Sequence, residues 1–129
     1  MTFLKSYSGP LLSVFRIAAG LLFLQHGTTK YLSLPPTQMS GASPMTMGGA
    51  AGLIELVCGA LIVLGLFTRP AAFLASGTMA VAYFMAHAPQ NFYPILNGGE
   101  LAALYCFAFL YLSAAGPGPI SIDRMRGAA

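Results

Sequence analysis

Four apolar segments, each about as long as a bilayer is thick, constrain this chain most strongly. They cover about residues 10–31, 48–67, 69–87 and 98–115. A helix needs roughly 20 apolar residues to cross the hydrocarbon core, and each segment is near that length. None alternates apolar and polar residues as a barrel strand does. Because lipid offers the backbone no hydrogen-bond partners, the sequence predicts an all-α membrane protein, a bundle of four transmembrane helices.

The composition excludes an ordinary soluble domain. Hydrophobic residues make up 57% of the 129-residue chain and charged residues only 7%, whereas a soluble domain usually carries about 25% charged residues. So few polar groups cannot cover a surface that faces water, and the lipid bilayer is the expected partner. The length suits a single membrane domain over residues 1–129. The net charge of +3 is scattered beside apolar segments and gives no sign of nucleic-acid binding.

The positive charges predict the orientation of the bundle. Four spans place both termini on one side of the membrane, and most of the Lys and Arg residues fall on that side: Lys5, Arg16, Arg69, Arg124 and Arg126. Lys30 alone falls on the other side. Cytoplasmic loops carry the excess of Lys and Arg, so both termini are expected in the cytoplasm. The 33–47 and 88–94 loops then face outward.

One tight turn and the C-terminal segment lie on the predicted cytoplasmic side. In the turn at 66–72, Thr68 can cap the third helix and Pro70 suits a first helical turn. Residues 116–129 end the fourth helix with Gly and Pro and leave a short basic tail.

Ionisable residues gather in the outer half of the predicted bundle. Tracing the helices through the membrane in turn places five titratable side chains there: His26, Lys30, Glu55, His87 and Glu100. An ionisable residue within a span is costly and marks a functional site by default. The sequence therefore predicts a ligand-binding or proton site among these five residues, with catalytic residues left unassigned.

Glu55 is the deepest of the five, roughly 10 Å below the outer end of its helix at 1.5 Å per residue. It shares a helix face with the glycine stripe of residues 48, 52 and 59, which lets another helix approach closely. Glu55 is therefore expected to point into the bundle, where it needs a proton or a partner such as His26 or Arg16. Arg16 itself either extends toward the cytoplasm or neutralises a carboxylate.

Structural interpretations compete at the other positions. Asn97 and Glu100 have the spacing of a capping box, which we favour as the role of Glu100. Lys30 lies at a helix end and fits an anchor whose ammonium reaches toward the membrane surface. His87 fits a position in the wet interface. Aromatic residues of the fourth span, such as Tyr105, are expected to pack rather than to form a cofactor site.

Other cofactors are less well supported. Haem b would need His26 and His87 as facing axial ligands, and two histidines in four helices make it an unlikely cofactor. The histidines and glutamates include metal-ligand types but lack a signature spacing, so no metal site is predicted. Cys58 and Cys106 lie in separate spans without a CxxC pair, which argues against a dithiol redox centre.

Several stretches together resemble the DoxX family of small bacterial membrane proteins. They are FRIAAGLLFLQHGTTKY at 15–31, GGAAGLIELVCGALIVLGLFTRPAA at 48–72, MAVAYFMAHAP at 79–89, and NGGELAALYCFAFLYLSAAGPGPISID at 97–123. The resemblance covers nearly the whole chain. It implies a four-helix bundle in the bacterial inner membrane and a redox setting, because family members are linked to quinones and to membrane oxidoreductase assemblies. It carries over no catalytic residue.

Two functions from different classes follow. The first is an accessory membrane subunit of a quinone-linked redox system, with a quinone or proton site in the outer half of the bundle. The sequence shows no electron carrier, so catalysis would need a partner or a bound cofactor, and whether the chain is an enzyme stays open. The alternative is a non-catalytic subunit that packs against a larger membrane complex. A transporter would need discontinuous helices and repeats, which are not evident.

Overall fold

The structure, a computed structural model, describes residues 2–129 and shows only helices, with no strand among them. Five short helical segments flank or extend four longer helices. The bounds are as follows: η1 Thr2–Tyr7, α1 Ser8–Leu32, α2 Met47–Leu64, α3 Thr68–Ala82, η2 Tyr83–His87, η3 Ala88–Gln90, α4 Pro94–Asn97, α5 Glu100–Ala115 and α6 Ile122–Met125. The prediction of an all-helical protein is therefore confirmed.

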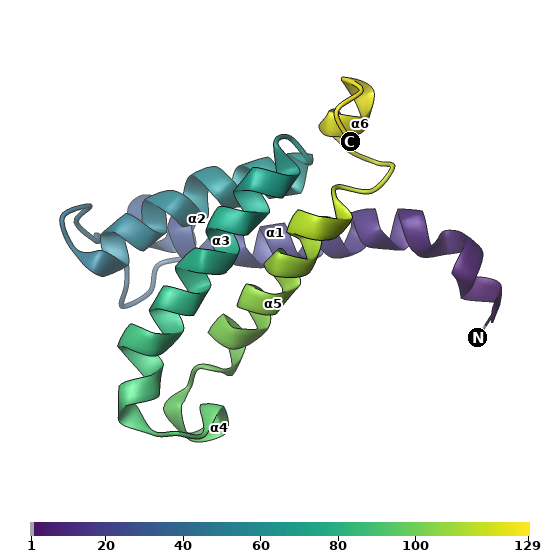
Figure 1. Cartoon of the computed structure of the whole chain (residues 1–129). Helices are drawn as coiled ribbons and strands as arrows, with labels where there is room; N and C mark the ends of the chain where they lie inside the picture. The colour runs from purple at the N-terminus through teal and green to yellow at the C-terminus, as the bar shows by residue number, and fades with distance from the viewer. Residues whose placement is uncertain (1) are drawn as a thin grey trace.

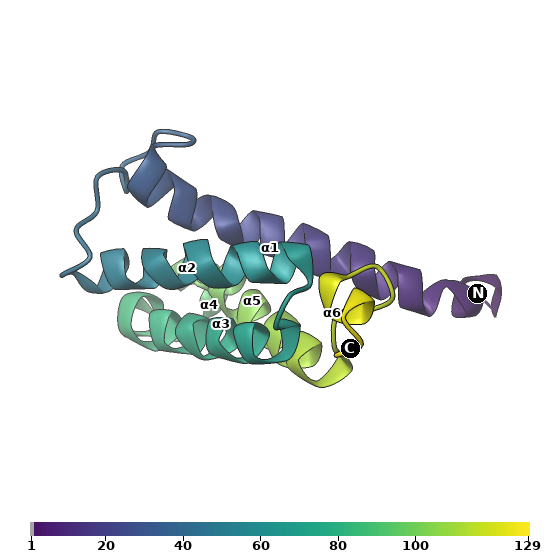
Figure 2. The same ribbon diagram turned by 90° about the horizontal axis from the view of Figure 1, so that it is seen from above.

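The helices form two antiparallel pairs. Helix α1 packs mainly along α2, and α3 packs mainly along α5, while α2 and α3 join the two pairs. Figure 1 shows the α3–α5 pair crossing the α1–α2 pair at an angle. The N- and C-terminal segments lie at the end of the bundle where α2 turns into α3 (Figures 1 and 2). The α1–α2 loop and α4 lie at the other end of their respective pairs.

Three helical stretches are long and apolar enough to cross a membrane: Thr2–Leu32, Met47–Leu64 and Thr68–Gln90. The fourth, Glu100–Ala115, is apolar but has only 16 residues. At 1.5 Å per residue it is about 24 Å long, short of the roughly 30 Å hydrocarbon core. Its shortness has a local cause, because Gly98 at φ +73° ends α4 before α5 begins. The protein thus has three full-length spans and a shorter fourth helix.

Aromatic side chains form the centre of the bundle, where α1 meets α5. The ring of Phe23 lies 4.9 Å from that of Phe109 and 5.7 Å from that of Tyr105, both edge to face, and the last two rings stack at 5.6 Å. Large apolar side chains such as Phe84 and Phe107 instead point outward. A surface of this kind suits lipid rather than water, because exposed apolar patches are limited on soluble proteins.

Glycines set the distance between α1 and α2. A Cβ atom added at Gly27 would lie 2.8 Å from the backbone nitrogen of Leu56, and one at Gly59 would lie 2.9 Å from the Cα of Leu24. A real Cβ does not fit at such distances without movement of the backbone. The glycine stripe therefore brings α1 and α2 into backbone contact, as small residues do between membrane helices.

The segment after α5, predicted as a short basic tail, folds back onto the bundle. The carboxylate of Asp123 accepts hydrogen bonds from the backbone N–H groups of Phe67 and Thr68, both at 2.9 Å. Burial alone would raise the pKa of this carboxyl, but the bonds from Thr68, Phe67 and Arg126 hold it below its usual value. Asp123 therefore caps α3.

This cap corrects the expected role of Thr68. The residue before α3 is Phe67, in the left-handed region at φ +50°, and Thr68 is the first residue of the helix. A side chain in that place does not reach back to cap its own helix, since the N-cap residue is the one that precedes the first turn. The orphan N–H groups are instead satisfied by Asp123 from across the bundle.

Arg16 has no carboxylate partner within its span. Its guanidinium is 1% exposed and donates to three backbone carbonyls, those of Ile62, Val63 and Pro117. Two of these carbonyls belong to the last turn of α2, where a cation complements the negative end of the helix dipole. Arg16 thus joins α1, α2 and the segment after α5 at the same end of the bundle.

Candidate functional site

A buried ion pair joins the end of α1 to the middle of α2. The ammonium of Lys30 lies 2.7 Å from a carboxylate oxygen of Glu55, and the two side chains are 8% and 5% exposed. Gly52 makes room for this contact, because a Cβ there would lie 2.8 Å from Cδ of Lys30. The prediction that Lys30 is an outward anchor is therefore wrong. Its side chain turns inward and pairs with Glu55, because neither charge would have a partner in the apolar interior without the other.

His26 lies one helical turn before Lys30 on the same face of α1. Its ring meets that of Tyr105 edge to face, with the centroids 6.1 Å apart. Its Nε2 atom is buried and has no hydrogen-bond partner within residues 2–129. Most buried polar atoms have a partner, so an orphan of this kind needs an explanation. Glu55, for which we expected His26 or Arg16 as partner, is bonded to Lys30 instead.

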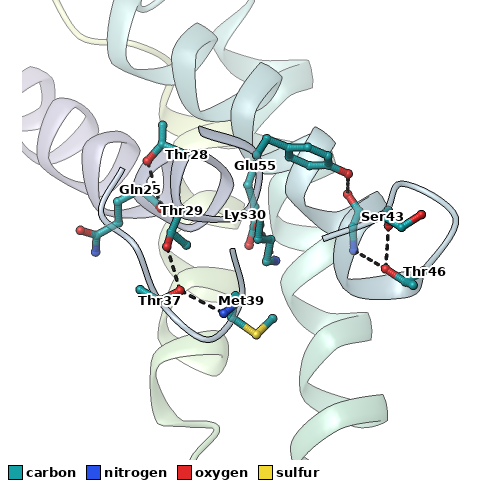
Figure 3. Close-up of polar contacts among 11 residues, drawn as sticks. Gln25, Thr28, Thr29, Lys30, Thr37, Met39, Ser43, Thr46 and Glu55 are labelled. Carbon is teal, nitrogen blue, oxygen red and sulfur yellow. Dashed lines mark hydrogen bonds and ion pairs between the residues drawn. The ribbon is translucent and has the colours of Figure 1, made fainter. Parts of the chain in front are cut away.

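A cleft of about 240 Å³ lies beside His26. Besides His26 it is lined by Gln25 and Thr29 of α1 and by Pro35 and Thr37 of the α1–α2 loop. These residues bring an amide, two hydroxyls and an imidazole to one cavity. Figure 3 shows Gln25, Thr29 and Thr37 near the charged pair. Ligand pockets commonly combine an apolar wall with a few convergent polar groups of this kind.

Threonine side chains fold the loop over this end of α1. The hydroxyl of Thr28 donates to the carbonyl of Leu34 at 2.6 Å, and that of Thr29 bonds the carbonyl of Pro35. The hydroxyls of Thr29 and Thr37 are 2.8 Å apart, as Figure 3 shows. The loop is therefore held in place by hydrogen bonds, and it forms one wall of the cleft.

His87 belongs to a separate polar cluster between η2 and α4. Its Nδ1 lies 3.0 Å from the carbonyl oxygen of Asn97, and the Asn97 amide donates to the hydroxyl of Tyr83 at 3.2 Å. In Figure 1, α4 lies well away from the α1–α2 loop. The structure therefore brings together His26, Lys30 and Glu55 and places His87 elsewhere.

Glu100 lies outside both clusters. Glu100 is exposed, and its side chain makes no hydrogen bond within the described residues 2–129. The capping box is also wrong, since Gly99 is the N-cap of α5 and receives no side-chain cap. Asn97 ends α4, and the turn at Gly98 separates α4 from α5. The side-chain oxygen of Asn97 accepts a hydrogen bond from the Gly99 N–H across this turn, at 2.8 Å. Glu100 therefore cannot reach back to Asn97 as a capping box requires.

Sequence reasoning missed the neutral members of the site. Gln25 and Thr29 flank His26 on α1, and Thr37 comes from the loop. Tyr105 packs in the core, as expected, but also meets His26. The signal available was the run of polar residues around His26 near the end of an apolar helix. No group of three or more His, Cys, Asp or Glu residues in the part of the chain described is placed to hold a metal ion.

Comparison with known proteins identifies related membrane proteins. The DoxX family model matches residues 11–88, a stretch that includes His26, Lys30, Glu55 and His87 but not Glu100. No solved structure matches significantly.

Three relatives match over most of their length. An uncharacterized protein of Haemophilus influenzae is 42% identical over 131 residues, which cover 96% of each chain. The inner membrane protein YphA of Escherichia coli is 36% identical, covering 88% of this chain and 89% of YphA. The uncharacterized membrane protein Rv3486 of Mycobacterium tuberculosis is 27% identical, covering 89% of this chain and 80% of Rv3486. Similarity at this coverage extends over most of the helical bundle.

Proposed function

The chain belongs to the DoxX family, and we propose that it is an accessory subunit that binds a quinone or quinol head group in the cleft beside His26. That it is a multi-pass protein of the bacterial inner membrane, as the sequence predicts, follows from the family, the apolar helices and the named relatives. The ligand, its site and its partner subunit belong to the proposal.

The orphan nitrogen of His26 carries this proposal. Nε2 is buried without a partner beside a cleft of about 240 Å³. A quinone carbonyl accepts a hydrogen bond, and a quinol hydroxyl both donates and accepts, so either form can pair with an imidazole nitrogen. The side-chain amide of Gln25 adds further N–H donors at the same cavity. The apolar tail of the ligand then lies along the lipid-facing surface of the bundle.

The Lys30–Glu55 pair supports proton exchange at this site. Reduction of a quinone takes up two electrons and two protons, and oxidation of a quinol releases them. A buried carboxylate bonded to an ammonium provides titratable groups one helical turn from His26 on α1. The electrons come from a redox partner, because the side chains of this chain offer no electron carrier of their own.

The test measures quinone bound per protein, and quinol-linked activity, in membranes that contain the protein at normal abundance. His26→Phe keeps the ring that meets Tyr105 and removes both nitrogens, and we expect it to lower bound quinone about tenfold, the effect of losing about 1.4 kcal/mol. Glu55→Gln keeps a hydrogen-bonding side chain and should lower activity as well. His87→Phe is the matched control, since His87 lies outside the cleft.

Two results would count against this function. Wild-type quinone content in both His26→Phe and Glu55→Gln would reject the quinone site and leave the non-catalytic packing subunit as the better account. Equal losses in His26→Phe and His87→Phe would show that replacing either half-buried histidine damages the bundle.

We also propose that both termini face the cytoplasm. The structure places the two terminal segments at the same end of the bundle, and the positive charges gather at that end. Single cysteines introduced in the 33–47 loop should react with a membrane-impermeant thiol reagent added from outside, and cysteines near residue 127 should not. Labelling of the loop only from the cytoplasm would reverse the topology.

A further inference from the structure

A second cavity lies at the opposite end of the bundle from the quinone site. It has a volume of about 90 Å³ and lies where the segment after α5 meets the start of α3. Its polar lining comes from Thr68, Arg69, Asp123 and Arg126. One ordered water needs only about 10–15 Å³ of such volume, so the cavity can take a larger polar group.

A buried hydroxyl in this cavity has no partner. Thr68 is completely buried; its Oγ1 lies near the Asp123 carboxylate and helps to lower the pKa of that group, but no contact within residues 2–129 has hydrogen-bond geometry. In the described residues 2–129, the other buried polar side-chain atom without a hydrogen-bond partner is Nε2 of His26. Each of the two orphan atoms thus belongs to a residue that lines one of the two cavities. A buried polar atom without a partner commonly marks a group that the protein alone does not supply.

The arginines of this cavity have donors to spare. Arg16, deeper in the bundle, donates through all three guanidinium nitrogens to backbone carbonyls. Within residues 2–129, Arg69 donates only through Nη1, to the carbonyls of Ser113 and Ala114, and Arg126 only through Nε, to Asp123. Each therefore keeps two nitrogens for a ligand, and a guanidinium suits phosphate oxygens in particular.

The geometry holds these groups in place before a ligand arrives. The guanidinium carbon of Arg126 lies over the Phe67 ring, 4.4 Å from its centre, in a cation–π contact. Asp123, the acidic residue of the cavity, uses both carboxylate oxygens to cap α3 and accepts from Arg126. With its charge offset by Arg126, the residues that line the cavity carry a net positive charge from Arg69.

We propose that this cavity binds the phosphate of an anionic lipid head group. The site lies at the end of the bundle that carries both terminal segments and most of the cationic residues, where the helices leave the hydrocarbon core. Basic pockets between helices at that level of the membrane suit anionic lipid head groups. Arg69 and Arg126 bind the phosphate oxygens, and the hydroxyl of Thr68 donates a further hydrogen bond from the cavity floor.

The experiment measures lipid retention by native mass spectrometry, after the full chain is exchanged into vesicles of phosphatidylcholine with or without phosphatidylglycerol. The wild-type protein should retain phosphatidylglycerol at least about tenfold more tightly than phosphatidylcholine. Arg126→Gln should reduce that preference about tenfold, because it removes a charged hydrogen-bond donor to the phosphate. Lys5→Gln/Arg124→Gln removes two exposed charges outside the cavity and should leave the preference within about twofold.

Thr68→Val separates a ligand contact from a structural role. It removes the orphan hydroxyl without changing charge or shape, so the lipid-free protein should unfold at the same or a higher temperature. Retention of phosphatidylglycerol should nevertheless fall about threefold, as expected for one neutral hydrogen bond. This variant keeps the proposal testable even where an arginine replacement unfolds the chain.

Three outcomes would overturn the proposal. An equal loss in the Lys5→Gln/Arg124→Gln variant would show diffuse attraction to an anionic surface rather than a site. Wild-type retention in both Thr68→Val and Arg126→Gln would leave the cavity to water. In phosphatidylcholine vesicles, inorganic phosphate could stabilise the protein as much as phosphatidylglycerol does. That result would make the ligand a free anion, not a lipid.

Discussion

Removing one member of the Lys30–Glu55 pair should destabilise the protein more than removing both. The two groups are 2.7 Å apart and nearly excluded from solvent. At an effective dielectric constant of about 20, their attraction is about 6 kcal/mol. Each ion gives up several kcal/mol of hydration in the interior, so the net contribution of the pair is small. A lone partner keeps its hydration loss without the attraction.

The perturbation is a double-mutant cycle of Lys30→Met, Glu55→Leu and the two combined. Each single replacement should lower the free energy of unfolding by about 3–5 kcal/mol, and the double replacement by less than either, because apolar side chains of similar volume often replace a buried ion pair without loss. Circular dichroism during titration of detergent-solubilised protein with sodium dodecyl sulfate measures these changes. Lys5→Met, which removes an exposed charge, should change stability by no more than about 0.5 kcal/mol.

Additive losses would refute this reasoning. If the double variant loses the sum of the two single losses, the charges do not interact and the site is hydrated. Single losses below about 1 kcal/mol would lead to the same conclusion, because that is the range of solvent-exposed pairs. The cycle also separates fold from function: a stable double variant that keeps bound quinone but loses quinol-linked activity would assign the pair to proton exchange.

Three other predictions concern stability and redox chemistry. The fold holds the pKa of the Asp123 carboxyl below its usual value. Its ionised form therefore stabilises the protein at neutral pH, and this contribution is lost as the pH falls below about 4. Asp123→Asn should lower the free energy of unfolding by about 1–3 kcal/mol at neutral pH and reduce the acid dependence of thermal unfolding. Gly27→Ala should lower stability by about 1–3 kcal/mol because its Cβ would meet backbone at 2.8 Å, whereas Gly77→Ala, with open space around it, should not. Cys58→Ala/Cys106→Ala should keep wild-type quinone content and activity, and a loss in a folded double variant would revive the dithiol that we exclude.

The membrane helices were predictable because their signal is local. Length and apolar composition alone predict helices that cross a bilayer, and the structure confirms three of full length. The fourth helix was expected at about residues 98–115, and its start two residues later, at Glu100, was not predicted, because the break depends on Gly98 adopting a positive φ. A glycine permits that conformation without requiring it. The orientation of the bundle stays a prediction, since the positive charges bear on it and the fold alone does not.

The site was predictable in residue type but not in pairing. Depth along each helix placed Lys30 and Glu55 in the same half of the bundle, yet the contact depends on how α1 and α2 are aligned across Gly52. His87 and Glu100 were assigned to the site by depth alone, although α3 and α5 diverge from α1 toward that end of the bundle. Depth is a single coordinate, and it cannot distinguish residues at one level that lie on different sides of a bundle.

The cap on α3 gives assembly of this protein an order in time. The backbone of Phe67 leaves the ribosome before Asp123, which follows 56 residues later. Helices α1, α2 and α3 must therefore enter the membrane while the first N–H groups of α3 still lack their carboxylate. Only when the segment after α5 has been synthesised can it close that turn and bring the Pro117 carbonyl to Arg16. The terminal end of the bundle is thus completed after the spans are inserted, and chains stalled before residue 123 should expose that turn to quality-control proteases of the membrane.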